Sequence, residues 1–238
     1  MSNFRVRAFG AAAIVGSVFG GALILAQQDP TAMEQRVAAL KRSIAESQAR
    51  LRKYEWVETT IVSLKNEEKN RKQQRCYYGA DGKVQKVLLD DQKAAPPSGG
   101  RLKQRVVQKK TGEMKDYMES AAALIQQYVP PNPADIDSAK KAGKVAIKPG
   151  QGGRVHLEFT DYIKPGDLMA IDVDAAANAL VGLSVNTYLD KADDAVTLKV
   201  AFGALPDGAS YTAQTTLDAK AKNITVVVQN SGHRPVGQ

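Results

Sequence analysis

The stretch AVTLKVAFGALPDGASYTAQTTLDAKAKNITVVVQNS, residues 195–231, decides the fold. Apolar and polar residues alternate along it in two runs, which is the period of a half-buried strand. The apolar positions are Val196, Leu198, Val200 and Phe202, then Ile224, Val226 and Val228. Turn residues at 206–208 and 218–223 separate the strands. Connections this short join antiparallel neighbours, so the stretch predicts a meander with one apolar face.

The same pattern extends toward the N-terminus. Between residues 154 and 188 two further alternating runs, separated by turn-rich segments, bring the C-terminal meander to about six strands. Residues 54–64 alternate as well, 69–78 is a basic strand, and Asp81 with Gly82 is a hairpin signal that leads into 84–89. The sequence therefore predicts about nine antiparallel strands.

Helical patterns interrupt these strands at two places. Asp29 and Pro30 form a helix start, and an apolar stripe predicts a helix over 31–53 that packs on the sheet in preference to a coiled coil. A second helical face runs from Leu102 to Val129, and a short helix ends at Gly143. The expected fold class is α+β, with a strongly curved antiparallel sheet packed against the N-terminal helix and the helical insertion 102–143. Residues 27–238 are expected to form this single domain.

The N-terminus has the pattern of an export signal. Arg5 and Arg7 precede the uncharged apolar run 8–26, and Gln27 begins a polar segment. We interpret residues 1–26 as a signal peptide and place the protein in the periplasm or outside the cell. An uncleaved membrane anchor is the alternative, because 19 apolar residues are nearly enough to cross a bilayer.

Composition excludes several classes of protein. Hydrophobic residues make up 43% and charged residues 24% of the 238, which argues against a disordered chain or a polytopic membrane protein. The single Cys76 excludes an internal disulfide and a Cys-rich zinc module, and His156 and His233 are the two histidines. We expect no metal, no cofactor and no enzymatic activity.

Positive charge is concentrated in the N-terminal half. Residues 34–115 contain 20 Lys and Arg against 10 Asp and Glu, whereas residues 116–238 contain 11 against 14. Arg71, Lys72 and Arg75 lie on the basic strand and are the predicted contacts for an anionic membrane surface or an acidic protein. Nucleic acid is not an expected partner of an exported protein.

The order of these elements resembles that of the outer-membrane lipoprotein carrier family and related exported lipid-binding half-barrels. The resemblance lies in a signal peptide, one amphipathic helix, a few strands, a helical insertion and a long antiparallel meander. It implies an unclosed barrel of strands, plugged by helices, whose apolar concave face holds acyl chains. The insertion 102–143 would be the plug.

The predicted function is accordingly capture of an apolar or lipid-like ligand between sheet and helices. Met and aromatic residues make adaptable apolar walls, and the predicted lining residues are Trp56, Met114, Met118, Met169 and Phe202. The pocket is expected between residues 113–129 and the sheet, with a volume of a few hundred cubic ångströms, the order of usual ligand sites. The alternative is a cell-envelope structural or interaction protein that binds through its basic half.

Other polar residues are interpreted without a catalytic role. His156 and Glu158 share one face of a strand and are predicted to be an ordinary surface pair. His233 is predicted to be a mobile terminal histidine. Cys76 is predicted to be a small buried core residue. Asp190, Asp193 and Asp194 are predicted to form a plain turn.

Overall fold

A computed structural model of the protein describes residues 30–93 and 101–237. The predicted signal peptide and most of the loop before the helical insertion lie outside the described residues. The strands are β1 (Tyr54–Leu64), β2 (Glu67–Tyr78), β3 (Val84–Lys93), β4 (Val145–Pro149), β5 (Arg154–Thr160), β6 (Leu168–Asp174), β7 (Ala179–Tyr188), β8 (Ala195–Ala204), β9 (Ser210–Ala219) and β10 (Ile224–Pro235). The helices are α1 (Pro30–Leu51), α2 (Arg101–Ile125) and α3 (Pro133–Lys141), with short 3-10 turns η2 (Gln151–Gly153) and η3 (Lys220–Lys222).

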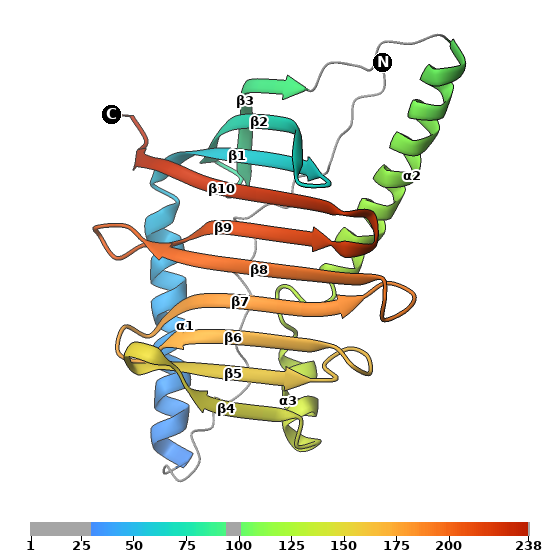
Figure 1. The fold of residues 1–238 in the computed structure, drawn as a ribbon. Helices are drawn as coiled ribbons and strands as arrows, with labels where there is room; N and C mark the ends of the chain where they lie inside the picture. Colours follow the sequence, from blue (N-terminus) through green and yellow to red (C-terminus); the bar gives the residue numbers. More distant parts are fainter. Residues whose placement is uncertain (1–29, 94–100, 238) are drawn as a thin grey trace.

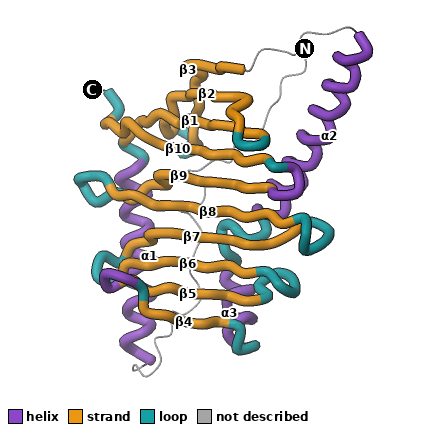
Figure 2. Tube along the Cα trace, in the orientation of Figure 1, coloured by secondary structure: helices purple, strands orange, loops and turns teal. Residues whose placement is uncertain are grey.

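All ten strands belong to one antiparallel sheet in the order β3-β2-β1-β10-β9-β8-β7-β6-β5-β4. The last strand returns beside the first, with Thr60 opposite Val228, so the N-terminal strands and the C-terminal meander are continuous. The sheet is open, because β3 and β4 are its edges (Figure 1). Figure 2 shows how strands dominate the architecture.

The predicted fold class was wrong. The described residues form a largely β fold of ten strands, rather than an α+β fold of about nine. The strand that was missed is β4, which has five residues, ends in Pro149 and pairs only with β5. A short edge strand has one neighbour and little room for alternation, so its sequence signal is weak. The alternating runs that were predicted correspond to β1, β5, β7, β8 and β10.

One face of the sheet carries the core, as predicted. Its buried residues alternate along the central strands and include Leu157, Phe159, Met169, Ile171, Val173, Leu183, Val185, Val196, Leu198, Val200, Leu217, Val226 and Val228. Figure 1 shows α1 and α3 on the same side of the sheet. Within α1, Leu40 is buried in the core, and the Ser47 hydroxyl donates to the carbonyl of Ser210 on β9. The predicted packing of this helix on the sheet is confirmed.

Candidate functional site

Helix α2 divides into a buried half and an exposed half. Ala121, Leu124 and Ile125 near its C-terminal end are buried in the core, whereas Arg105 and Val106 near the other end are exposed. Figure 1 shows the first half standing clear of the strands while the second half lies against the sheet. A helix of this kind is fixed at one end, and its other end is available to a partner.

The buried end is held by a polar network around Asp167. Tyr128, just after α2, donates its hydroxyl to the Asp167 carboxylate at 2.6 Å and lies 2.8 Å from the Thr187 hydroxyl. The same carboxylate accepts the backbone N–H groups of Tyr162, Ile163 and Lys164. Burial and the neighbouring carboxylate raise the pKa of Tyr128, so its hydroxyl stays a proton donor. This network was not predicted, because it joins three segments that are far apart in the sequence.

The middle of α2 carries the residues that we call the methionine face, Met114, Tyr117 and Met118. All three are half-buried and pack against the core. The Tyr117 hydroxyl donates to Asp194 in the β7–β8 turn, and the Lys222 ammonium lies 5.6 Å from the centre of the Tyr117 ring. The methionine face therefore lies beside the β7–β8 and β9–β10 connections, where α2 leaves the sheet.

The predicted lining residues do not form one site. Met169 is fully buried among core residues of β6, while Met114 and Met118 lie on α2 at the end of the sheet. Phe202 on β8 lines a different pocket, between α1 and the sheet, together with Ile44. The structure brings together only the two α2 methionines from the predicted set.

The pocket at Phe202 is small. Its volume is about 10 Å³, room for about one water molecule, and its walls are Ser43, Ile44, Ser47, Asn178, Ala179, Leu180, Phe202 and Ser210. The expected large cavity lay elsewhere, between residues 113–129 and the sheet. There Ala121, Leu124 and Ile125 of α2 are buried in the core. A ligand under α2 would have to displace part of this helix.

Trp56 belongs to an aromatic cluster near the N-terminal end of β1. Its indole N–H donates to Asn230 at 3.0 Å, and its ring stacks on His233 with a centroid distance of 5.8 Å. The ring of Tyr211 also packs on His233, with a centroid distance of 4.1 Å, and the ring centroids of Tyr78 and Trp56 are 5.8 Å apart. The four rings therefore pack on one another in a chain from Tyr78 through Trp56 and His233 to Tyr211.

The prediction of a mobile His233 was therefore wrong. The residue lies within β10, and burial lowers the pKa of its imidazole to about 4. A terminal histidine is mobile only where nothing packs on it, whereas β10 carries this one back to β1 and its aromatic neighbours. Neighbouring strands, not distance from the C-terminus, decide its environment.

The three predicted anion-binding residues lie on two faces of β2. Thr60 on β1 is opposite both Lys72 and, on β10, Val228, so Lys72 shares the face of the core. Arg71 and Arg75 have the other parity and lie on the opposite face. Arg71 makes a bidentate contact with Glu68 at 2.7 and 2.9 Å, and Arg75 lies 3.9 Å from Glu55. The structure thus divides this cluster and places carboxylates beside both arginines.

The core-facing side of β1 and β2 is polar around Glu58. Glu58 is 1% exposed and accepts two hydrogen bonds from the Lys86 ammonium, at 2.6 and 2.7 Å. Cys76 is buried and free of any disulfide, which confirms the prediction of a buried cysteine. Burial raises the pKa of its thiol to about 11, so this cysteine is not a reactive thiolate at neutral pH.

His156 has one neighbour more than its sequence pattern showed. Its Nδ1 lies 2.8 Å from Asp172 on β6, and its Nε2 lies 3.6 Å from Glu158. Lys148 on β4 also contacts Glu158, at 2.9 Å, and lowers the pKa of that carboxyl by a hydrogen bond. The cluster is a partly exposed network of charges across three strands.

Within residues 30–93 and 101–237, no group of three or more His, Cys, Asp or Glu side chains is arranged to hold a metal ion. None of the helices in these ranges is long and apolar enough to cross a membrane.

The geometry defines an open, largely β-sheet protein with helices on one face. No protein family model matches the chain, and no curated protein matches it. Among solved structures, the chain is similar to the crystal structure of a DUF1329 family protein from Desulfovibrio piger ATCC 29098. The match has 10% sequence identity and a TM-score of 0.39, and it covers 89% of this chain and 95% of that one.

Proposed function

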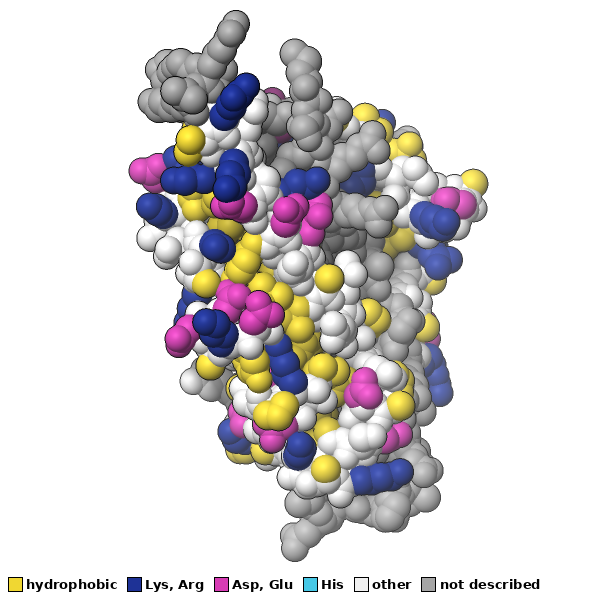
Figure 3. Space-filling model, turned by 90° about the vertical axis from the view of Figure 1, so that its right-hand side faces the viewer, with side chains coloured by type: hydrophobic (Ala, Val, Ile, Leu, Met, Phe, Trp, Pro, Cys, Tyr) yellow, Lys and Arg dark blue, Asp and Glu magenta, His cyan; other side chains and the backbone are white. Residues whose placement is uncertain are grey.

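We propose that the protein is an exported binding protein for an apolar or lipid-like ligand, which enters between the methionine face of α2 and the sheet. The observation that carries the proposal is that Met114 and Met118 are half-buried against the core where α2 leaves the sheet. Unbranched thioether side chains adapt to irregular apolar ligands at low cost. Figure 3 shows hydrophobic side chains gathered along the middle of one side face, where such a ligand would find apolar surface.

The entry of a ligand requires α2 to yield, and its packing supports this. The Asp167 network fixes the C-terminal end of the helix, and the half that precedes Ala121 can shift without disturbing that end once the Tyr117 hydroxyl releases Asp194. Binding in this way needs no large cavity in the unliganded protein. We propose a binding role rather than an enzymatic one, and a location in the periplasm or outside the cell.

A fluorescent fatty-acid probe tests the proposal. The protein should bind the probe with micromolar affinity, a free energy of about 8 kcal/mol. Replacing both methionines by glutamine, which is of similar length but polar, should weaken binding at least about tenfold, since an apolar contact is lost at each position. Replacing both by leucine is the matched control and should preserve binding.

Two results would contradict the proposal. The first is no probe binding by the unmodified protein. The second is weakened binding after Phe202→Ala and normal binding after the methionine-to-glutamine changes, which would place the ligand in the small pocket beside α1.

A further inference from the structure

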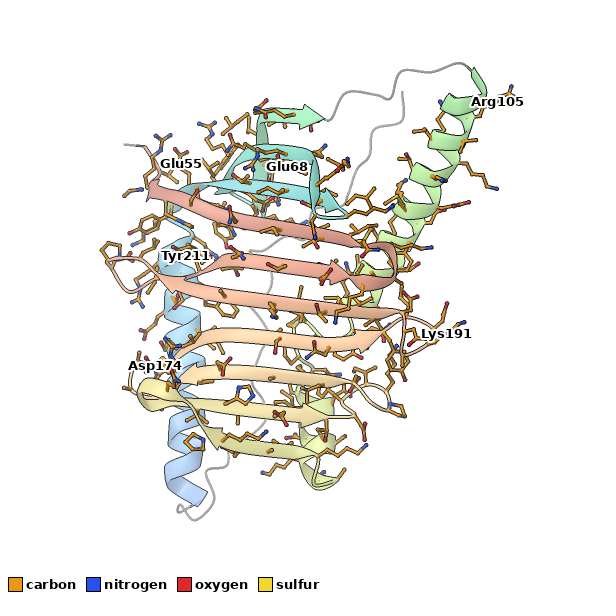
Figure 4. The ribbon with its side chains drawn as sticks, viewed as in Figure 1. Glu55, Glu68, Arg105, Asp174, Lys191 and Tyr211 are labelled. Atoms are coloured by element: carbon orange, nitrogen blue, oxygen red, sulfur yellow. The ribbon has the colours of Figure 1, made fainter. Side chains whose placement is uncertain are left out.

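The first ten residues of α2 have an unusual charge composition. The segment RLKQRVVQKK, residues 101–110, contains five Lys and Arg and no Asp or Glu. We call this segment the basic arm. Figure 4 shows Arg105 near the free end of α2, away from the strands. Within residues 105–110, the part of the arm whose side chains the structure describes, three cations and no carboxylate are present.

The described cations of the arm are weakly paired. Lys109 lies 3.9 Å from Glu113, but these side chains are 80% and 62% exposed, so water screens the pair. Among the described side chains, no carboxylate pairs with Arg105 or Lys110. Residues 105–110 therefore present a positive field to solvent, which Glu113 offsets only in part.

An apolar residue lies among these charges. Val106 is 56% exposed and is flanked in the helix by Arg105, Lys109 and Lys110. A single exposed valine is ordinary on a soluble surface, so it matters here only together with the cations around it. At a membrane, however, a valine can enter the boundary between head groups and acyl chains while neighbouring cations contact the head groups.

From this geometry we propose that the basic arm docks the protein on a membrane surface that contains anionic phospholipids. Charge complementarity selects the anionic surface, and the exposed valine favours a lipid bilayer over an acidic protein. The apolar run 8–26 in the sequence is consistent with a chain that reaches membranes during export. The docking surface is distinct from the methionine face, so the two functions can fail separately.

Vesicle flotation of the full protein, as recovered from an exporting host, tests the docking. Vesicles that contain phosphatidylglycerol are compared with vesicles of phosphatidylcholine alone. We expect binding to the anionic vesicles only, and we expect it to weaken as salt is added. Each Lys or Arg near an anionic membrane contributes about fivefold in affinity, so the triple change Arg105→Glu, Lys109→Glu and Lys110→Glu should lower binding at least about a hundredfold.

A matched variant reverses the same number of charges elsewhere. Lys140, Arg154 and Lys199 are exposed residues on α3, β5 and β8. Changing all three to glutamate should lower vesicle binding less than about threefold, since they lie outside the arm. An equal loss in both variants would overturn the proposal, because binding would then depend on net charge alone.

Val106→Ser separates a membrane from an acidic protein. This change should weaken vesicle binding about fivefold, because the apolar contact is lost while every charge remains. Poly-glutamate should compete poorly with the vesicles. Unchanged vesicle binding by the serine variant, together with full competition by poly-glutamate, would overturn the membrane assignment in favour of an acidic protein. Fatty-acid probe binding by the same variants reports separately on the methionine face.

Discussion

Strand β2 and the basic arm are both rich in Lys and Arg, yet the structure treats their charges differently. In β2 and its neighbours, Arg71 is paired with Glu68, Lys69 with Glu67, and Lys86 with the buried Glu58. In the arm, Arg105, Lys109 and Lys110 are exposed beside an exposed valine. Two of the strand pairs use carboxylates of β2 itself and the third uses Glu58 of β1, whereas residues 101–110 contain no Asp or Glu. Positive charge in a sequence thus becomes a positive surface only where no carboxylate, from the same element or a neighbouring one, lies beside it.

The largest effect on this comparison should come from removing the buried carboxylate of the sheet. Glu58→Gln should lower the free energy of unfolding by about 3 kcal/mol, because the Lys86 ammonium, in a side chain only 17% exposed, would lose its partner. Urea denaturation measures the change. The control is Glu68→Gln, which breaks an exposed pair and should cost less than about 1 kcal/mol. Equal losses would show that the sheet does not distinguish buried from exposed pairs.

Much of the fold is predictable from local pattern. The alternation in β7, β8 and β10 is strong because one face of each strand is buried and the other is solvated. β4 escapes because an edge strand of five residues that ends in proline shows almost no alternation. The predicted fold class was wrong because the helices were expected to contribute as much to the architecture as the strands. A single ten-stranded sheet organises the chain instead.

The candidate site was less predictable, for a physical reason. Strand alternation alone separates Lys72 from Arg71, so the sequence does contain the signal that places them on opposite faces. The pairing of Arg75 with Glu55 depends on strand register, which the sequence does not reveal. Likewise, Met169 and Met114 are chemically alike, and only the packing of β6 and α2 makes one a core residue and the other a surface candidate.

His233 provides a second test, at the aromatic cluster that it forms with Trp56 and Tyr211. Its pKa is about 4 in the folded protein and near 6.5 when unfolded, because burial disfavours the charged ring. Between these values the unfolded state binds more protons, so the free energy of unfolding should fall as the pH is lowered. We expect a loss of about 2 to 3 kcal/mol from this residue between pH 7 and about pH 4.5.

Comparison with His233→Phe isolates this contribution, because phenylalanine can keep the contacts with Trp56 and Tyr211 without titrating. Denaturant unfolding of both proteins at the two pH values measures it. The variant should lose less stability on acidification than the parent. Identical losses would mean that the half-buried imidazole of His233 titrates alike in the folded and unfolded protein.

The smallest effect is expected from the paired arginines of β2, and it sharpens the comparison most. Arg71→Gln with Arg75→Gln removes two positive charges, as does Arg105→Gln with Lys110→Gln in the arm. The net charge changes equally, but Arg71 is paired with Glu68 at 2.7 Å, so part of the outward field of the strand is already cancelled. Arg75 lies 3.9 Å from Glu55, a carboxylate that Arg234 contacts at 2.5 Å. We expect the strand variant to lose less than about threefold in affinity for phosphatidylglycerol vesicles and the arm variant about twentyfold.

A strand variant that loses as much as the arm variant would show that the anionic surface is bound by β2, through the set Arg71, Lys72 and Arg75 that the sequence predicts. Because the two variants carry the same total charge, the ratio of their affinities reports where on the molecule the positive field is available, independently of how strong that field is.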